Sequence, residues 1–142
     1  MLFRSLDAAR HEYRTHSESP AVKQRYLEAL LLNRTNTTEA LSLATALHHA
    51  EPAGLAPRVS LARALALQSR WAEAEKLLQE IPVETLRKAG PELLTRCFLV
   101  RGEVLVELER RQDAAAVLAD VNPIHLYPDE VQRYQLLRQR AQ

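Results

Sequence analysis

The residues that could hold a metal ion are few, and their spacing does not suit a metal site. His11 and His16 lie five positions apart, whereas the histidines of a helical zinc-protease motif lie four apart and share one face. His48 and His49 are adjacent, so on a helix their side chains would point about 100° apart. We therefore expect no metal site and place the histidines, His125 included, on helix surfaces or at helix ends.

No arrangement typical of a catalytic or cofactor-binding site is present either. The single cysteine, Cys97, adjoins Phe98 in an apolar segment, which favours a buried thiol over a nucleophile. Glu103 and Glu107 have helical spacing, but no histidine joins them as in a helical carboxylate metal site. The three glycines are scattered and cannot form a phosphate-binding loop. We expect no enzymatic activity and no cofactor.

Composition narrows the function classes further. The 142 residues fit one domain over residues 1–142. A net charge of +1 gives no concentrated basic face for nucleic acid. No apolar run is long enough for a membrane span, and charges at Arg4 and Asp7 come too early for a signal peptide. These features predict a cytoplasmic protein that binds neither nucleic acid nor a membrane.

Prolines and polar breaks divide the chain into helices. Proline is tolerated in the first turn of a helix but breaks its interior, and the apolar residues between the prolines recur at three and four positions. The segment from Val83 to Ala89 could add a helical turn. The predicted helices are 2–16, 20–33, 38–50, 55–68, 71–81, 91–109, 111–121 and 128–141.

The helices also repeat. A shift of about 34 residues, the period of a helix–turn–helix repeat, superimposes several apolar and small residues. The superimposed pairs are Leu27 and Leu61, Leu31 and Leu65, Ala40 and Ala74, and Leu47 and Ile81. A further shift, of about 40 residues, reaches Phe98, Gly102, Leu105, Ala114, Leu118 and Val121. Small residues at such positions let neighbouring helices approach closely.

On these positions the chain resembles the tetratricopeptide-repeat family with degenerate repeats. Glu28 stands where that pattern has a small residue, and Arg101 where it has a leucine. The resemblance implies an all-α fold: an α-solenoid of about three hairpins, with repeats over 20–52, 55–82 and 91–123. The apolar faces of 2–16 (Leu2, Phe3, Leu6, Ala9, Tyr13) and 128–141 (Val131, Tyr134, Leu137) predict capping helices.

The resemblance also implies a concave groove lined by the first helix of each hairpin. Three arginines along it, Arg25, Arg63 and Arg96, could attract an acidic segment or a terminal carboxylate. Reversing the charge of Arg63 and Arg96 should then abolish partner binding without changing helix content. The predicted groove residues are Val22, Arg25, Ala29, Asn33, Val59, Arg63, Ala66, Arg96, Leu99, Glu103, Val106 and Glu107.

The leading hypothesis is an adaptor or small chaperone that holds a peptide or helix of a partner protein, with an acidic or amphipathic segment as the ligand. A solvated charged face is the alternative reading of the groove residues. A second hypothesis is a structural domain that forms homo-oligomers through its terminal helices. A helical enzyme or metal protein comes last, because the clustered ligands that it needs are missing.

Overall fold

The computed structural model describes the backbone of residues 2–142 and the side chains from Leu6 onward. The described residues form helices and connecting turns, without a strand, which confirms the all-α class. None of these helices is long and apolar enough to cross a membrane. The chain divides into two compact units, residues 1–68 and residues 69–142. The prediction of one domain over 1–142 implies a single cooperative melting transition for both units.

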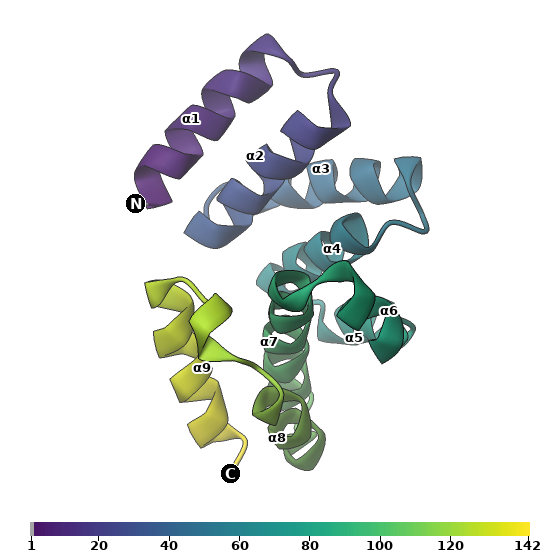
Figure 1. Cartoon of the computed structure of the whole chain (residues 1–142), viewed down its shortest axis with the longest axis vertical. Coiled ribbons are helices and arrows are strands. Elements are labelled where there is room, and N and C mark those ends of the chain that lie inside the picture. The colour runs from purple at the N-terminus through teal and green to yellow at the C-terminus, as the bar shows by residue number, and fades with distance from the viewer. Residues whose placement is uncertain (1) are drawn as a thin grey trace. The chain divides into compact units, whose positions relative to one another are not determined.

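The first unit is a group of packed helices in which α2 contacts each of the other three (Figure 1). The helix α2 packs against α1, α3 and α4, and α3 also packs against α4. The core of this unit includes the α2 leucines Leu27 and Leu30, both at 0% exposure, and the burial of each contributes roughly 2 kcal/mol. The bounds are α1 (Leu2–Thr15), α2 (Pro20–Asn33), α3 (Thr37–Ala50) and α4 (Leu55–Leu67).

The second unit is built around the longest helix, α7. This helix packs against α5, α6, α8 and α9. The short helix α6 coincides with the extra turn predicted for Val83 to Ala89, while the 3₁₀ turn η1 was not predicted. The bounds are α5 (Trp71–Gln79), α6 (Val83–Ala89), α7 (Pro91–Glu107), α8 (Arg111–Ala119), η1 (Pro123–His125) and α9 (Pro128–Arg140).

Local chemistry explains where the helices begin and end. Ser19 caps α2, because its hydroxyl accepts a hydrogen bond from the Val22 amide at 3.4 Å and Pro20 occupies the first turn. The predicted ends of 71–81 and 111–121 are two residues too long. There the chain leaves the helix in a tight turn, in which the Ile81 amide donates to Leu78 and the Val121 amide to Leu118.

The starts of α3, α5 and α8 share one arrangement. A non-glycine residue adopts positive φ at or just before each start, at Asn36, Ser69 and Glu109. An acidic residue then occupies the first turn of each helix, where it suits the helix dipole. In α5 and α8 the residue before the helix is an arginine that pairs with this acid, Arg70 with Glu73 and Arg110 with Asp113.

Residues that repeat in the sequence share the same environment. All the superimposed positions are buried, and the small residues Ala40, Ala74 and Ala114 are fully so, at 0% exposure. Gly102 allows α7 to approach α8 closely, since a β-carbon built there would meet Leu118 Cδ2 at 2.4 Å. The prediction that these small residues lie at helix contacts is confirmed.

The two terminal helices pack with the apolar faces predicted for them, as far as their side chains are described. In α1, Leu6 is buried while Ala9 and Tyr13 are half-buried, and the side chains of Leu2 and Phe3 lie outside the described residues. In α9, Tyr134 and Leu137 are buried and Val131 is half-buried. The role of both helices as caps of a solenoid stays a prediction.

Candidate functional site

The apolar residues predicted to line the concave groove are all covered. Each is at most 7% exposed, so none presents an open apolar surface to a ligand. The six residues are Val22, Ala29, Val59, Ala66, Leu99 and Val106. A partner could therefore contact only the polar residues of the predicted groove and not these apolar ones.

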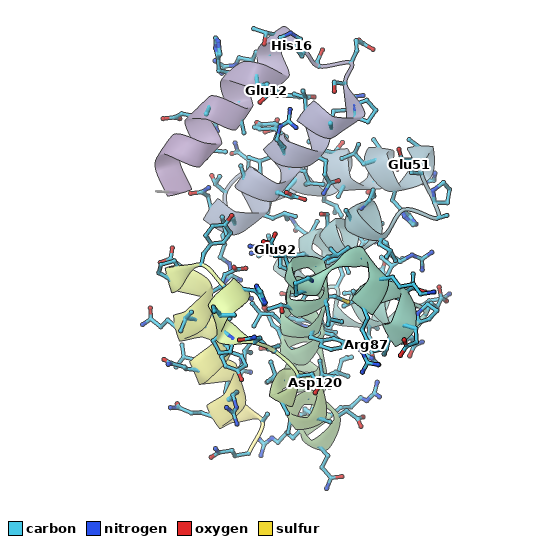
Figure 2. The ribbon with its side chains drawn as sticks, viewed as in Figure 1. Glu12, His16, Glu51, Arg87, Glu92 and Asp120 are labelled. Atoms are coloured by element: carbon cyan, nitrogen blue, oxygen red, sulfur yellow. The ribbon has the colours of Figure 1, made fainter. Side chains whose placement is uncertain are left out.

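The polar groove residues of the first unit lie in contacts within the chain. Arg25 forms an ion pair with Glu12 of α1, and Figure 2 labels Glu12 on that helix. Asn33 donates its side-chain amide to the Ala29 carbonyl at 2.8 Å. Arg63 is half-buried and also takes part in an interaction. Their assignment to a partner-binding groove stays a prediction.

The polar groove residues of the second unit join α7 to α9. Arg96 lies 3.3 Å from Glu130 and stacks over the ring of Tyr127 at 5.0 Å. Farther along α7, two glutamates pair with arginines of α9: Glu103 with Arg133, and Glu107 with Arg140. These three ion pairs hold α9 against the face of α7 that was predicted to receive a partner.

These contacts change how the charge-reversed variant of Arg63 and Arg96 must be interpreted. Glu130 is only 4% exposed, so a glutamate at position 96 would place two carboxylates together in a poorly solvated site. We expect that change to loosen α9. Loss of partner binding in this variant would therefore report on packing as well as on a groove.

The histidines are exposed or half-buried, whereas Cys97 is buried. His16 Nδ1 lies 2.8 Å from the hydroxyl of Thr15, and His48 is half-buried at the end of α3. Burial raises the pKa of the Cys97 thiol to about 12, which suppresses the reactive thiolate at neutral pH. Among residues 2–142 no cluster of three or more potential metal ligands occurs.

An opening lies in the first unit between α2 and α3, and we call it the α2/α3 groove. Its volume is about 1300 Å³, above the roughly 300–1,000 Å³ of small-molecule sites. The lining side chains are mostly small or apolar. They are Tyr13, Ser19, Pro20, Ala21, Lys23, Gln24, Thr38, Glu39, Ser42, Leu43, Ala46, Leu47, Ala50, Glu51, Ala56 and Pro57.

Half of the side chains that line the α2/α3 groove carry polar groups, and several of these groups already form hydrogen bonds within the chain. Glu39 accepts a hydrogen bond from the Tyr26 hydroxyl at 2.9 Å. The Gln24 amide donates to Glu28 and to Ser60, each at 2.9 Å, while its carbonyl oxygen is buried without a donor in the described part of the chain. Glu51, labelled in Figure 2 at the end of α3, is exposed.

None of the lining residues belongs to the predicted groove. The groove was predicted on the first helix of each hairpin, and these helices correspond to α2, α4 and α7. The outward face of α3 was therefore not among the predicted residues. The sequence does contain a sign of this surface, because Thr38, Ser42, Ala46 and Ala50 are small residues at intervals of four. Such a row on an exposed helix face is suited to contact with another helix.

Comparison with known proteins gives no family assignment for this chain. No protein-family model matches it, and no curated protein and no solved structure shows significant similarity to it.

Proposed function

We propose that this chain is a protein-interaction module, an adaptor or small chaperone that holds a segment of another protein, and that it is not an enzyme. The single observation that carries the proposal is the α2/α3 groove, about 1300 Å³ in volume and lined mainly by small and apolar side chains. A groove of this size and lining suits a stretch of polypeptide better than a small substrate.

The helical array is consistent with degenerate tetratricopeptide-like hairpins, and we include that kinship and a cytoplasmic location in the proposal. Support for the kinship comes from positions that repeat in burial, such as Ala40 and Ala74 at 0% exposure. Further support comes from the shared starts of α3, α5 and α8, each with an acidic residue in the first turn.

A photo-reactive amino acid placed at Ser42, an exposed residue of the α2/α3 groove, tests the proposal. Illumination in a lysate of the source organism should join a defined protein to this variant. The matched control carries the same amino acid at Ala116, an exposed residue of α8 in the second unit. A cross-linked protein obtained equally from both positions, or from neither, would contradict the proposal.

Self-association is the second candidate, and the second unit supplies the observation that favours it. Ile124 and Leu136 are large apolar residues that remain 79% and 55% exposed. Surfaces of this kind can be covered by a second copy of the same chain. Sedimentation velocity over a wide concentration range tests it: a dimer that disappears in Leu136→Gln would support it, and a monomer at all concentrations would exclude it.

A further inference from the structure

The exposed face of α3 is shaped to receive another helix. Ser42, Ala46 and Ala50 are exposed and line the α2/α3 groove, and with Thr38 they form one row along the helix, because residues four apart lie above one another. Their side chains are too short to keep a neighbouring backbone at a distance. A row of small residues thus leaves a shallow channel, into which larger side chains of a second helix can fit.

The neighbouring row on α3 gives this channel an apolar middle and acidic ends. Leu43, which is half-buried, lies in the middle beside Leu47, which is covered at 7% exposure. Glu39 lies at one end and Glu51 at the other, and all four residues line the α2/α3 groove. The two glutamates are separated by about 18 Å along the helix axis. The only basic residue among the lining residues is Lys23, on the opposite wall, so negative charge is in excess.

The size of the opening agrees with a helical occupant. A helix of about 12 residues with a diameter of about 10 Å fills roughly 1400 Å³, comparable with the volume of about 1300 Å³ of the α2/α3 groove. Its length of about 18 Å matches the separation of Glu39 and Glu51 along α3. One amphipathic helix could therefore contact Leu43 and the row of small residues and reach both carboxylates at once.

The charges argue against a second copy of α3 as the occupant. In a symmetric antiparallel pair of α3 helices, Glu39 of one copy would face Glu51 of the other. Like charges in such a contact repel each other and disfavour the pairing. The occupant must instead bring positive charge to both ends of the groove.

We propose that the α2/α3 groove binds an amphipathic α-helix of a partner protein that has leucine-sized residues at spacings of three and four and a lysine or arginine near each end. This inference rests on the proposed function and names its ligand class. The apolar side chains enter the channel over Ala46 and Ala50, and the two cations meet Glu39 and Glu51.

Fluorescence anisotropy with labelled helical peptides of about 16 residues tests the inference on the full chain. The first probe carries leucines at the stated spacing, a lysine near each end and glutamine elsewhere. The second has glutamate in place of both lysines, and the third has serine in place of the leucines. We expect the first to bind at least about tenfold more tightly than either of the others.

Two exposed positions supply variants that should fold normally. Ala46→Glu places a long charged side chain in the channel and should weaken the first probe at least about tenfold, whereas the matched control Ala116→Glu on α8 should bind it as the parent does. Glu51→Lys, at the end of α3 where the helix dipole favours a cation, should narrow or reverse the preference between the lysine and glutamate probes.

The possible results separate this inference from the proposed function. Equal binding of the lysine and glutamate probes would overturn the inferred charge. Binding of a proline-containing, non-helical version that is lost in Ala46→Glu would overturn the helical occupant but keep a segment-binding groove. Self-association abolished by Ala46→Glu would make a second copy the occupant. No binding of any probe, together with no Ser42-specific cross-link, would remove both proposals.

Discussion

The guanidinium of Arg101 on α7 donates two hydrogen bonds to the buried carboxylate of Glu75 on α5. One joins Nε to Oε1 at 2.9 Å, and the other joins Nη2 to Oε2 at 3.2 Å. Glu75 is only 4% exposed, and Arg110 approaches its Oε2 to 3.1 Å. A buried carboxylate is tolerated when its charge is compensated and its lone pairs are used. This network joins α5, α7 and the start of α8 within the second unit.

Replacing Arg101 by leucine, the residue of a regular repeat, should therefore destabilise the protein. Glu75 would keep only Arg110 as a cationic partner, and we expect a loss of roughly 2–4 kcal/mol in the free energy of unfolding. Urea denaturation followed by circular dichroism measures the change. The double variant Glu75→Leu/Arg101→Leu should recover much of it, because no unpaired buried charge remains.

The control for this network is Arg87→Leu, because Arg87 pairs with Glu84 on the surface, where the two side chains are 63% and 74% exposed. Exposed pairs contribute little, so this variant should melt close to the parent. If Arg101→Leu proved as stable as the parent, Glu75 would have to be solvated and the network would not hold α7 in place.

Gly102 of α7 and Leu118 of α8 lie in close contact, so we expect a single added methyl group at Gly102 to be costly. In Gly102→Ala the new β-carbon would lie 2.4 Å from Leu118 Cδ2, so α7 and α8 must separate or Leu118 must leave its rotamer. We expect a loss of about 1–3 kcal/mol in the free energy of unfolding, measured by urea denaturation.

A double-mutant cycle isolates this contact. Leu118→Ala alone should cost roughly 2–5 kcal/mol, because it leaves a cavity at a side chain that is 1% exposed. In that background Gly102→Ala should add almost nothing, since the clash has been removed. Additive costs of the two changes would show that the destabilisation does not arise from this contact.

We expect His48 to make the free energy of unfolding depend on pH. Its pKa is lowered from the ordinary value of 6.5, first by burial and then by the nearby charges of Arg58 and His49. In the described structure its buried Nδ1 has no hydrogen-bond partner. The unfolded chain thus takes up the proton more readily than the folded one, so the free energy of unfolding should fall as pH drops below about 6.5.

Urea denaturation at a series of pH values checks this effect. The parent should lose stability between about pH 7 and pH 5, whereas His48→Gln should lose less over the same range. Arg58→Gln should give an intermediate profile, because one of the cations that oppose protonation is removed. A parent and His48→Gln with parallel profiles would show that His48 is solvated and titrates alike in both states.

Much of the fold could be predicted because its determinants are local. Ser19-Pro20 and the polar turn around Asn33 specify α2 without reference to any other helix, and the bounds 20–33 are confirmed. The turn η1 escaped prediction, since Pro123 was used only as a boundary marker. In the structure Asn122 caps this turn by accepting a hydrogen bond from the Ile124 amide at 3.2 Å.

The candidate site could not be predicted in the same way, because it depends on contacts between distant residues. In the sequence, Arg101 is an isolated departure from the repeat. Its partner Glu75 lies 26 positions away, so local sequence does not indicate that the two form an ion pair. Val59 and Leu99, at positions that line the groove in the family, are both buried at 4% exposure. The spacing of apolar residues along a helix does not indicate which of them neighbouring helices cover. The width of the α2/α3 groove likewise follows from how two helices cross, which neither helix determines alone.

The ion pairs between α7 and α9 can be tested by exchanging the charges of one pair. We expect the exchange to restore stability that reversal of one charge alone removes. Glu103 pairs with Arg133, and their side chains are only 12% and 24% exposed. Glu103→Arg would oppose two guanidinium groups in this partly buried site, and we expect a loss of roughly 1–3 kcal/mol. Adding Arg133→Glu should recover at least half of it, because the pair is rebuilt with its charges exchanged.

Urea denaturation of the parent, the two single variants and the double variant gives the coupling energy between Glu103 and Arg133. Glu84→Arg is the matched control, since it reverses a glutamate that is 74% exposed and should change stability little. The coupling should shrink in high salt only modestly, because partly buried pairs are weakly screened. A double variant no more stable than the sum of the singles predicts would mean that the ion pair of Glu103 and Arg133 does not help to hold α9 against α7.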